Sequence, residues 1–562
     1  MAIPSVCASL HWLLAAGMWL NAQDQVKTLC VAGMAKQRQG DNDGAVAEYN
    51  HAIELMPKFS EAYTLRASAR AAKGDLDAAL ADANRAIELN PNLKEAYDTR
   101  GNIKRVKHDL DAALDDFNRA VQLTPTSARF YTDRGLAWKD KGAIERALVD
   151  FDCAIKLDSR YYPAYTIRSE VRRLNRNFED ALKDATQAIE IDPKKPHAYE
   201  IRATINATKG DFDKALADCD RAITLDSKRA EAYATRGNVH LSRGDLQAAD
   251  ADFTHAISLN ARLASAYASR GIVDTERGDI DRALSDYSRC IEVDPKLPRG
   301  YNGRGIVKLR NKEFDNANAN FEFALHLGPQ FAPAYNNRGT IKYLRGDSGG
   351  AMKDFSRAIE ADRNNVIGYR RRGLIYFEKQ QWADALREFR KSAEILPNDQ
   401  DYGRLFVWVV RSQLGENHAA DQELADYFST RPMHAAKDWR TRIISFMLGR
   451  ILEKDFCPPE SPQGQLSTTG EEWFLVDTIA HQDGNSFGRK LNIGRVCEAW
   501  FYAGMKRLAA GDKRTAIELF KKCLATDQKT FVEFGLAATE LKMLGDNQDG
   551  SSASAVRNAL QP

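Results

Sequence analysis

A period of 34 residues constrains this chain more than any other feature of its sequence. Residues 230–263 read AEAYATRGNVHLSRGDLQAADADFTHAISLNARL, and residues 264–297 read ASAYASRGIVDTERGDIDRALSDYSRCIEVDPKL. Eleven such blocks cover residues 26–399 without an insertion, beginning at residues 26, 60, 94, 128, 162, 196, 230, 264, 298, 332 and 366. A unit of this size cannot bury its apolar face alone, so the blocks are expected to stack into an elongated array.

Two helices are predicted in each block. Apolar and small residues recur at helical spacing on both sides of a break such as Gly244-Asp245. Numbered from its first residue, each block has a small residue at position 8 and Ala at position 20, and most blocks have an aromatic residue at position 24. The small residues let two helices approach closely, and the aromatic ring fills the space beside them. The pattern predicts an all-α chain of antiparallel helical hairpins.

These features, with Tyr at position 4 of ten blocks and Pro near the end of seven, resemble the tetratricopeptide repeat (TPR). The resemblance implies a right-handed solenoid of eleven regular repeats and about two degenerate or terminal ones. It also implies a protein that binds peptide segments of other proteins along a concave groove and has no catalytic apparatus.

Position 7 departs from the TPR pattern, in which Leu is usual. It is Arg in ten consecutive blocks, from Arg66 to Arg372, and position 23 is acidic in ten blocks, from Glu48 to Glu388. Two rows of opposite charge along one stack are expected to pair, while the Arg stems cover apolar surface. The competing interpretation is a ladder that binds an anionic ligand.

The 34-residue frame decays beyond residue 399. Residues 400–433 are expected to form a degenerate TPR-like hairpin with Ala419 at its small position, and residues 434–496 a helix and an irregular loop insertion. The frame returns in residues 497–545 as a terminal TPR and a capping helix, and a disordered tail is predicted for 546–562. The runs GRVCEAWFYAG and KTFVEFGLAATELKML resemble the end of bacterial periplasmic NlpI-type TPR adaptors, which implies an adaptor in the cell envelope.

Cys497 and Cys523 are a candidate disulfide. They occupy positions 1 and 27 of the terminal hairpin, so the start of its first helix is expected near the end of its second. A bridge requires Cα atoms within about 7 Å of each other. Two alternatives remain open: both residues pack independently in the core, or Cys457 is the partner of Cys497.

Residues 1–25 are predicted to be a signal peptide or an apolar N-terminal helix that packs on the first repeat. The run from Val6 to Leu20 has no charged side chain, and Ala22 offers a small residue for cleavage. Export to the periplasm or another extracytoplasmic compartment is therefore predicted, and the alternative is a cytoplasmic protein. No apolar run reaches the length of about 18 residues that an integral membrane span needs.

Composition and motifs argue against several classes of function. Basic residues number 80 and acidic residues 78, so the chain lacks the positive charge expected of a nucleic-acid-binding protein. No metal-ligand spacing, Walker loop or dinucleotide glycine motif occurs. The sequence therefore predicts no enzyme activity, no metal and no cofactor.

The binding surface is predicted from positions 2, 5, 9, 12 and 13 of each first helix, which line the inner face of TPR arrays. Blocks 7 to 11 place apolar and amide-bearing residues there, and a partner segment is expected along blocks 8 to 11. The predicted groove consists of Leu241, Ile272, Asn302, Ile306, Leu309, Asn336, Tyr343, Arg370, Leu374 and Phe377. Blocks 3 to 5 instead present a basic patch of Arg105, Lys139 and Arg173.

The predicted groove and the predicted function of an envelope scaffold or adaptor each have an alternative. The alternative for the groove is that its apolar residues pack between adjacent first helices and bind no partner. A cytosolic regulatory or chaperone-like TPR protein and a TPR protein that assists polysaccharide export are the two competing functions.

Overall fold

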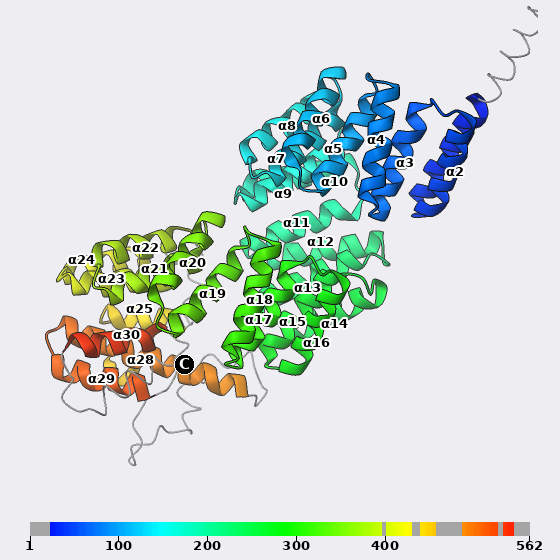
Figure 1. The fold of residues 1–562 in the computed structure, drawn as a ribbon. Coiled ribbons are helices and arrows are strands. Elements are labelled where there is room, and N and C mark those ends of the chain that lie inside the picture. Colours follow the sequence, from blue (N-terminus) through cyan, green and yellow to red (C-terminus); the bar gives the residue numbers. More distant parts are fainter. Residues whose placement is uncertain (1–22, 396–400, 430–438, 457–485, 526–531, 545–562) are drawn as a thin grey trace, which may run out of the picture. The chain divides into compact units, whose positions relative to one another are not determined.

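The computed structural model describes residues 23–395, 401–429, 439–456, 486–525 and 532–544. Every regular element in these ranges is an α-helix, which confirms the all-α prediction (Figure 1). The predicted signal peptide up to residue 22, most of the loop insertion and the tail at 546–562 lie outside the described residues.

The chain divides into two compact units, residues 1–245 and 246–562. Residues 23–38 form the first helix of the first unit. The helices that follow it in this unit are α2 (Asn42–Leu55), α3 (Ser60–Lys73), α4 (Leu76–Leu89), α5 (Lys94–Val106), α6 (Leu110–Leu123), α7 (Ala128–Asp140), α8 (Ile144–Leu157), α9 (Tyr162–Leu174), α10 (Phe178–Ile191), α11 (Pro196–Lys209), α12 (Phe212–Leu225) and α13 (Ala230–Arg243).

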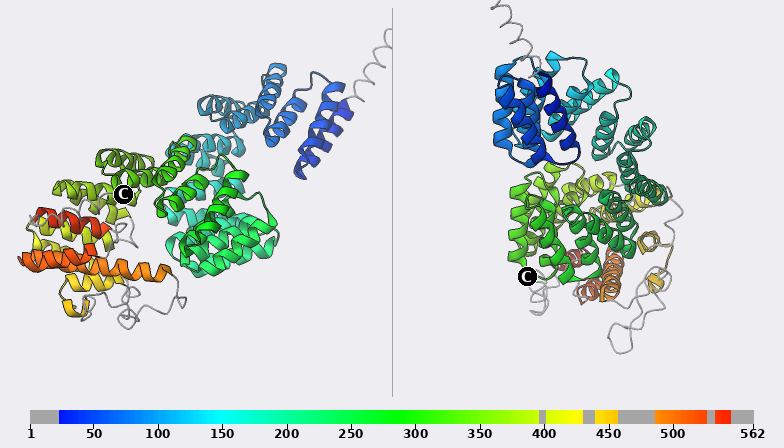
Figure 2. Two further views of the ribbon diagram at one scale, coloured as in Figure 1. Left: turned by 60° about the horizontal axis from the view of Figure 1, so that its bottom comes forward. Right: turned by 90° about the vertical axis from the view of Figure 1, so that its right-hand side faces the viewer.

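The second unit begins with the second helix of repeat 7, a division that the uniform period did not predict. Its helices are α14 (Leu246–Leu259), α15 (Ala264–Arg277), α16 (Ile280–Val293), α17 (Pro298–Arg310), α18 (Phe314–Leu327), α19 (Ala332–Leu344), α20 (Ser348–Ala361), α21 (Val366–Glu378), α22 (Trp382–Ile395), α23 (Asp401–Gln413), α24 (Asn417–Ser429), α25 (Trp439–Met447), α26 (Glu453–Phe456), α28 (Ser486–Ala509), α29 (Lys513–Ala525) and α30 (Val532–Met543). Within each unit the helices of a repeat lie side by side as hairpins, as the views of Figure 2 also show.

Residue size at positions 8 and 24 sets the contact between the two helices of a repeat. A Cβ atom added to Gly135 would lie 2.6 Å from Cε1 of Phe151, and Phe151 is fully buried. Where position 8 is larger, position 24 is smaller, as in the pair Ala203 and Cys219 of repeat 6. The regular repeats therefore never combine two large residues at these positions, as close packing of the two helices requires.

Position 15 turns the chain from the first helix into the second. This residue adopts a left-handed conformation, and most repeats use Gly there, as at Gly74 with φ 87°. Four repeats have a side chain instead, and their φ angles are 61° at His108, 59° at Arg176, 62° at Lys312 and 57° at Gln380. These residues bear the steric cost of a left-handed conformation, which Gly avoids.

The degenerate hairpin α23–α24 begins at residue 401 and departs from this size rule. Trp408 stands at position 8 and Leu424 at position 24, so both positions hold large residues. The buried small residue is Ala420, whereas the predicted Ala419 is exposed. The prediction was wrong by one residue because the hairpin starts one residue later than the repeat frame.

The C-terminal elements form one core with the last regular repeat. Buried residues of α21, α23, α25, α28, α29 and α30 belong to a single apolar cluster. The predicted boundary between residues 496 and 497 is wrong, because α28 runs without interruption from Ser486 to Ala509. This stretch contains no Pro, and the helix continues to the Gly511-Asp512 break.

We predict that Lys312→Gly stabilises the protein by about 1 kcal/mol, because Gly removes the cost of the left-handed side chain. Lys312→Ala is the matched control, since it shortens the exposed side chain and keeps the strained backbone. Urea denaturation followed by circular dichroism measures both. Equal stability of the Gly and Ala variants would show that position 15 is not strained.

Candidate interaction surface

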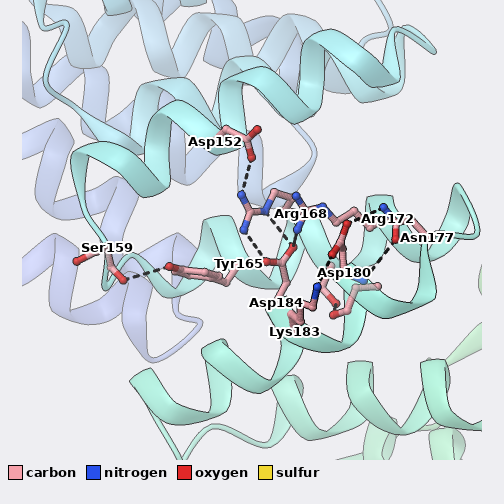
Figure 3. Close-up of polar contacts among 11 residues, drawn as sticks. Asp152, Ser159, Tyr165, Arg168, Arg172, Asn177, Asp180, Lys183 and Asp184 are labelled. Atoms are coloured by element: carbon pink, nitrogen blue, oxygen red, sulfur yellow. Dashed lines mark hydrogen bonds and ion pairs between the residues drawn. The ribbon is translucent and has the colours of Figure 1, made fainter.

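The Arg at position 7 joins three elements, as Arg168 of α9 shows in Figure 3. It donates from Nε and Nη2 to the two carboxylate oxygens of Asp184 in α10, at 2.9 and 2.5 Å. Its Nη1 donates to Asp152 of α8 in the preceding repeat at 2.5 Å, and its guanidinium lies 5.6 Å from the ring centroid of Tyr165. One side chain therefore connects the two helices of its repeat and the repeat before it.

The predicted pairing of positions 7 and 23 is confirmed in repeats of both units. The bridged pairs are Arg66–Asp82, Arg100–Asp116, Arg134–Asp150, Arg168–Asp184, Arg202–Asp218, Arg270–Asp286, Arg338–Asp354 and Arg372–Glu388. In repeat 9, Arg304 donates instead to the amide oxygen of Asn320. Because these guanidinium groups are engaged within the stack, they are structural, and the anion-ladder interpretation loses its basis.

Two contacts of this ladder were not foreseen from the sequence. The Nη1 atom bonds a polar residue at position 25 of the preceding repeat, such as Asn50 for Arg66 and Asn84 for Arg100. The sequence contained a signal for this contact, because position 25 is polar throughout the array. The stacking on Tyr at position 4 recurs in all ten repeats with Arg at position 7.

A second row of ion pairs links neighbouring repeats at their turns. A cation at position 14 contacts an acid at position 18 of the preceding repeat, and these acids are largely exposed. The pairs are Lys73–Asp43, Lys107–Asp77, Lys141–Asp111, Lys209–Glu179 and Arg345–Asp315. Solvent and salt screen such exposed pairs, so each of them adds little to the stability of the fold.

Half-buried apolar residues occupy the inner face of repeats 8 to 10. Ile272, Ile306, Leu309 and Tyr343 each keep part of their surface accessible, as does Leu241 in the first unit. Ile306 and Leu309 also pack against the core of repeat 9, so both interpretations of these residues hold in part.

Amide groups of the inner face are already paired within the chain. Asn302 is buried and accepts at 2.9 Å from Asn337, and Asn336 donates at 2.9 Å to Asn365. Asn336 keeps one buried carbonyl oxygen without a hydrogen-bond partner among the described residues. Arg370 is half-buried.

Leu374 and Phe377 are a correction to the predicted groove. They are 5% and 1% exposed, and they belong to the C-terminal core with residues of α28 and α30. The prediction placed them on the inner face by repeat position, and it missed that the end of the chain covers that face.

The basic patch of the first unit is partly neutralised. Arg105 bonds Asp140 at 2.6 Å, and Lys139 lies 3.5 Å from the other oxygen of that carboxylate. Arg173 is half-buried. Asp140 stands at position 13 of repeat 4, next to Lys139, so the sequence held the signal for this pairing.

Parts of this chain match sequence models of a known repeat family. Residues 30–93, 172–234 and 302–366 match one sequence model of the tetratricopeptide repeat, and residues 230–262 match a second. The chain contains tetratricopeptide repeats. TPR arrays present extended surfaces to other proteins, so a protein-interaction scaffold is the general function that the repeats support.

Solved structures similar to this TPR chain include three of low sequence identity. Yeast Tom70 is 16% identical, with 73% of this chain and 100% of that chain covered and a TM-score of 0.41. Cut9, from the APC/C hetero-tetramer Cut9-Hcn1, is 13% identical, with 78% and 98% covered and a TM-score of 0.39. A tetratricopeptide repeat protein from Parabacteroides merdae is 22% identical, with 44% and 98% covered and a TM-score of 0.36.

The terminal TPR brings its two cysteines together. Cys497 and Cys523 are buried thiols whose Sγ atoms lie 2.9 Å apart, and Gly504 packs on Phe520 as in the regular repeats. The disulfide itself stays a prediction. Cys457 lies outside the described residues.

The described part of the chain contains no cluster of His, Cys, Asp and Glu that would hold a metal ion. Its helices include none that is both long and apolar enough to cross a membrane.

Position 11 modulates the Arg ladder of these TPR units. It supplies a second cation to the position-23 acid in several repeats, for example Arg172, which contacts Asp184 at 2.7 Å. Repeat 4 has Trp138 there, so Arg134 is the ion-pair partner of the buried Asp150.

We predict that Arg134→Met destabilises the protein by about 3 kcal/mol, because it leaves Asp150 buried without its cation. Arg168→Met is the matched control and should cost clearly less, since Arg172 still contacts Asp184. Urea denaturation and hydrogen exchange of the affected hairpins measure the difference. An equal loss in both variants would contradict this account of position 11.

Repeat 8 reverses the charge at position 11. Asp274 is fully buried, and its oxygens accept no hydrogen bond among the described residues, although Arg282 lies 3.6 Å away. Burial raises the pKa of Asp274 to about 6; Asp286 and Asp250 add to this rise, and Arg282 and Arg270 oppose it. The folded-state pKa thus lies above the unfolded value of about 3.9, and ionisation destabilises the fold as pH rises through 6.

We predict that Asp274→Asn stabilises the protein at pH 7.5 by up to about 3 kcal/mol, and that this gain vanishes near pH 4. The control Asp286→Asn should destabilise at pH 7.5, because it removes the partner of Arg270. Urea denaturation at pH 4, 6 and 7.5 measures the three proteins. A parent and an Asp274→Asn variant of equal stability at every pH would refute the assignment.

Proposed function

We propose that this protein is a non-enzymatic scaffold or adaptor that binds segments of other proteins on the inner face of repeats 8 to 10. The inner face is defined by Ile272, Ile306, Leu309 and Tyr343, with Asn302 and Asn336 between them. The observation that carries the proposal is the accessible apolar surface of these side chains in a TPR array. Apolar side chains that stay exposed in a patch on the protein surface favour association with another protein.

The proposed site excludes the end of the regular array. Leu374 and Phe377 are covered by the chain itself, so they no longer belong to the surface that a partner would reach. Leu241 belongs to the first unit and is likewise left out.

The finer proposal is an adaptor in the bacterial cell envelope. Its support is the uncharged run from Val6 to Leu20 and the resemblance of the C-terminal part to NlpI-type adaptors. A mature protein that still begins with Met1 or Ala2 would contradict export and favour the cytosolic alternative. The assistance of polysaccharide export stays a weaker alternative, because the arginines of the ladder are engaged within the stack.

The test is a double substitution, Leu309→Glu with Ile306→Ser, followed by affinity capture from cell extract. The partners of the parent protein should be lost, because a charge on the inner face would have to be desolvated on binding. Phe323→Glu is the matched control, since Phe323 lies on the second helix of the same repeat and is 45% exposed. A folded double variant that keeps every partner would refute the proposed surface.

A further inference from the structure

The inner face has an occupant at its C-terminal end, which is helix α30. Leu536, Ala537 and Leu541 of α30 belong to the apolar cluster that also contains Leu374 and Phe377, at positions 9 and 12 of repeat 11. The helices α21 and α30 are in contact. A largely apolar helix of the chain itself therefore packs against the first helix of repeat 11, in line with the first helices to which partner binding is proposed in the preceding repeats.

Two buried glutamates of the terminal helices are held by donors of the inner face. Glu540 of α30 is 1% exposed and accepts at 2.8 Å from Gln413. Glu498 of α28 is 5% exposed and accepts at 3.1 Å from the hydroxyl of Tyr402. Tyr402 and Gln413 stand at positions 2 and 13 of the hairpin that begins at residue 401.

The covered and the accessible parts of the inner face are continuous. Tyr343 of repeat 10 donates its hydroxyl to Glu378 of repeat 11. Burial raises the pKa of Glu378, and the hydrogen bond from Tyr343 and the charges of Lys379 and Lys542 oppose that rise. Glu378 ends α21, the helix that α30 contacts.

Repeat 9 offers the same kinds of contact with stronger donors. Ile306 and Leu309 occupy positions 9 and 12, as Leu374 and Phe377 do in repeat 11. Positions 2 and 13 hold Arg299 and Arg310, and both are exposed. Arg310 donates to Glu276 at 2.8 Å and to the carbonyl oxygen of Thr275 at 2.7 Å, and its side chain remains 44% exposed at the edge of this surface.

We propose that the inner face of repeats 9 and 10 binds an amphipathic α-helix of another protein, laid in line with α30. Leucine and alanine side chains of that helix meet Ile306, Leu309 and Tyr343. Its glutamates meet Arg299 and Arg310. This assignment rests on the proposed function and names the class of partner segment.

A helix fits this surface better than an extended peptide. An extended segment needs donors and acceptors for its backbone, whereas a helix satisfies its own backbone groups. Asn302 and Asn336 would be the backbone contacts, but each is buried and bonded to another Asn of the chain. The surface is left with apolar side chains and guanidinium groups, which recognise one face of a helix.

The test uses the full chain with a photo-reactive benzoylphenylalanine at position 309, and at position 323 as the matched control. Cross-linking in cells followed by mass spectrometry identifies the attached segment. We expect cross-links at 309 to a segment with leucine or alanine at helical spacing and glutamates beside them. Arg299→Glu combined with Arg310→Glu should lower the yield at 309 at least about tenfold.

A synthetic copy of the cross-linked segment then tests its conformation. It should bind the full chain, and a proline at its centre should weaken binding at least about tenfold, because proline breaks a helix. A segment that tolerates the proline, or that lacks glutamates, overturns the helical assignment and leaves the proposed function standing. A yield at 309 no higher than at 323 overturns both, and a cross-link to residues 545–562 of the chain itself overturns the assignment to another protein.

Discussion

The contact between positions 8 and 24 governs the distance between the two helices of each repeat. Gly135 accommodates the ring of Phe151, and repeat 6 replaces that pair with Ala203 and Cys219. The degenerate hairpin departs from this pattern, with Trp408 and Leu424 at the two positions. Two small residues in place of Gly and Phe would leave a cavity between the helices, and two large ones would clash. Such a change would also affect the adjacent repeats, because each repeat packs on its neighbours.

The arginine ladder acts on top of this contact and fixes how one repeat follows another. Arg168 bonds its own second helix and the second helix of the repeat before it, while its guanidinium lies against Tyr165. The acid beneath it is almost fully buried, so each pair depends on both partners. Repeat 8 departs from this arrangement through Asp274, which places an additional acid at position 11, where several other repeats have a cation. Most arginines of the ladder are thus paired within the stack, whereas an anion-binding ladder would need them to face an anionic ligand.

Whether a residue of the inner face is buried or accessible depends on which other parts of the chain pack on it. The position-9 and position-12 residues of repeats 9 and 11 are all apolar, yet Leu309 keeps accessible surface and Phe377 does not. The difference is the terminal module, whose buried residues form one apolar cluster with Leu374 and Phe377 and whose buried Glu540 accepts a hydrogen bond from Gln413. The same face is therefore core at one end of the second unit and surface further along.

The sequence by itself determined the features that repeat. The helical hairpins, the small residues at position 8 and the pairing of Arg66 with Asp82 all follow from a period of 34, because equivalent residues meet equivalent neighbours in every copy. The tertiary structure decided what occurs once. The contact between Gln413 and Glu540 joins residues 127 positions apart, and Phe377 is buried in a core that includes residues of α28 and α30. Such contacts leave no periodic signal, because they depend on where the chain returns and not on local spacing.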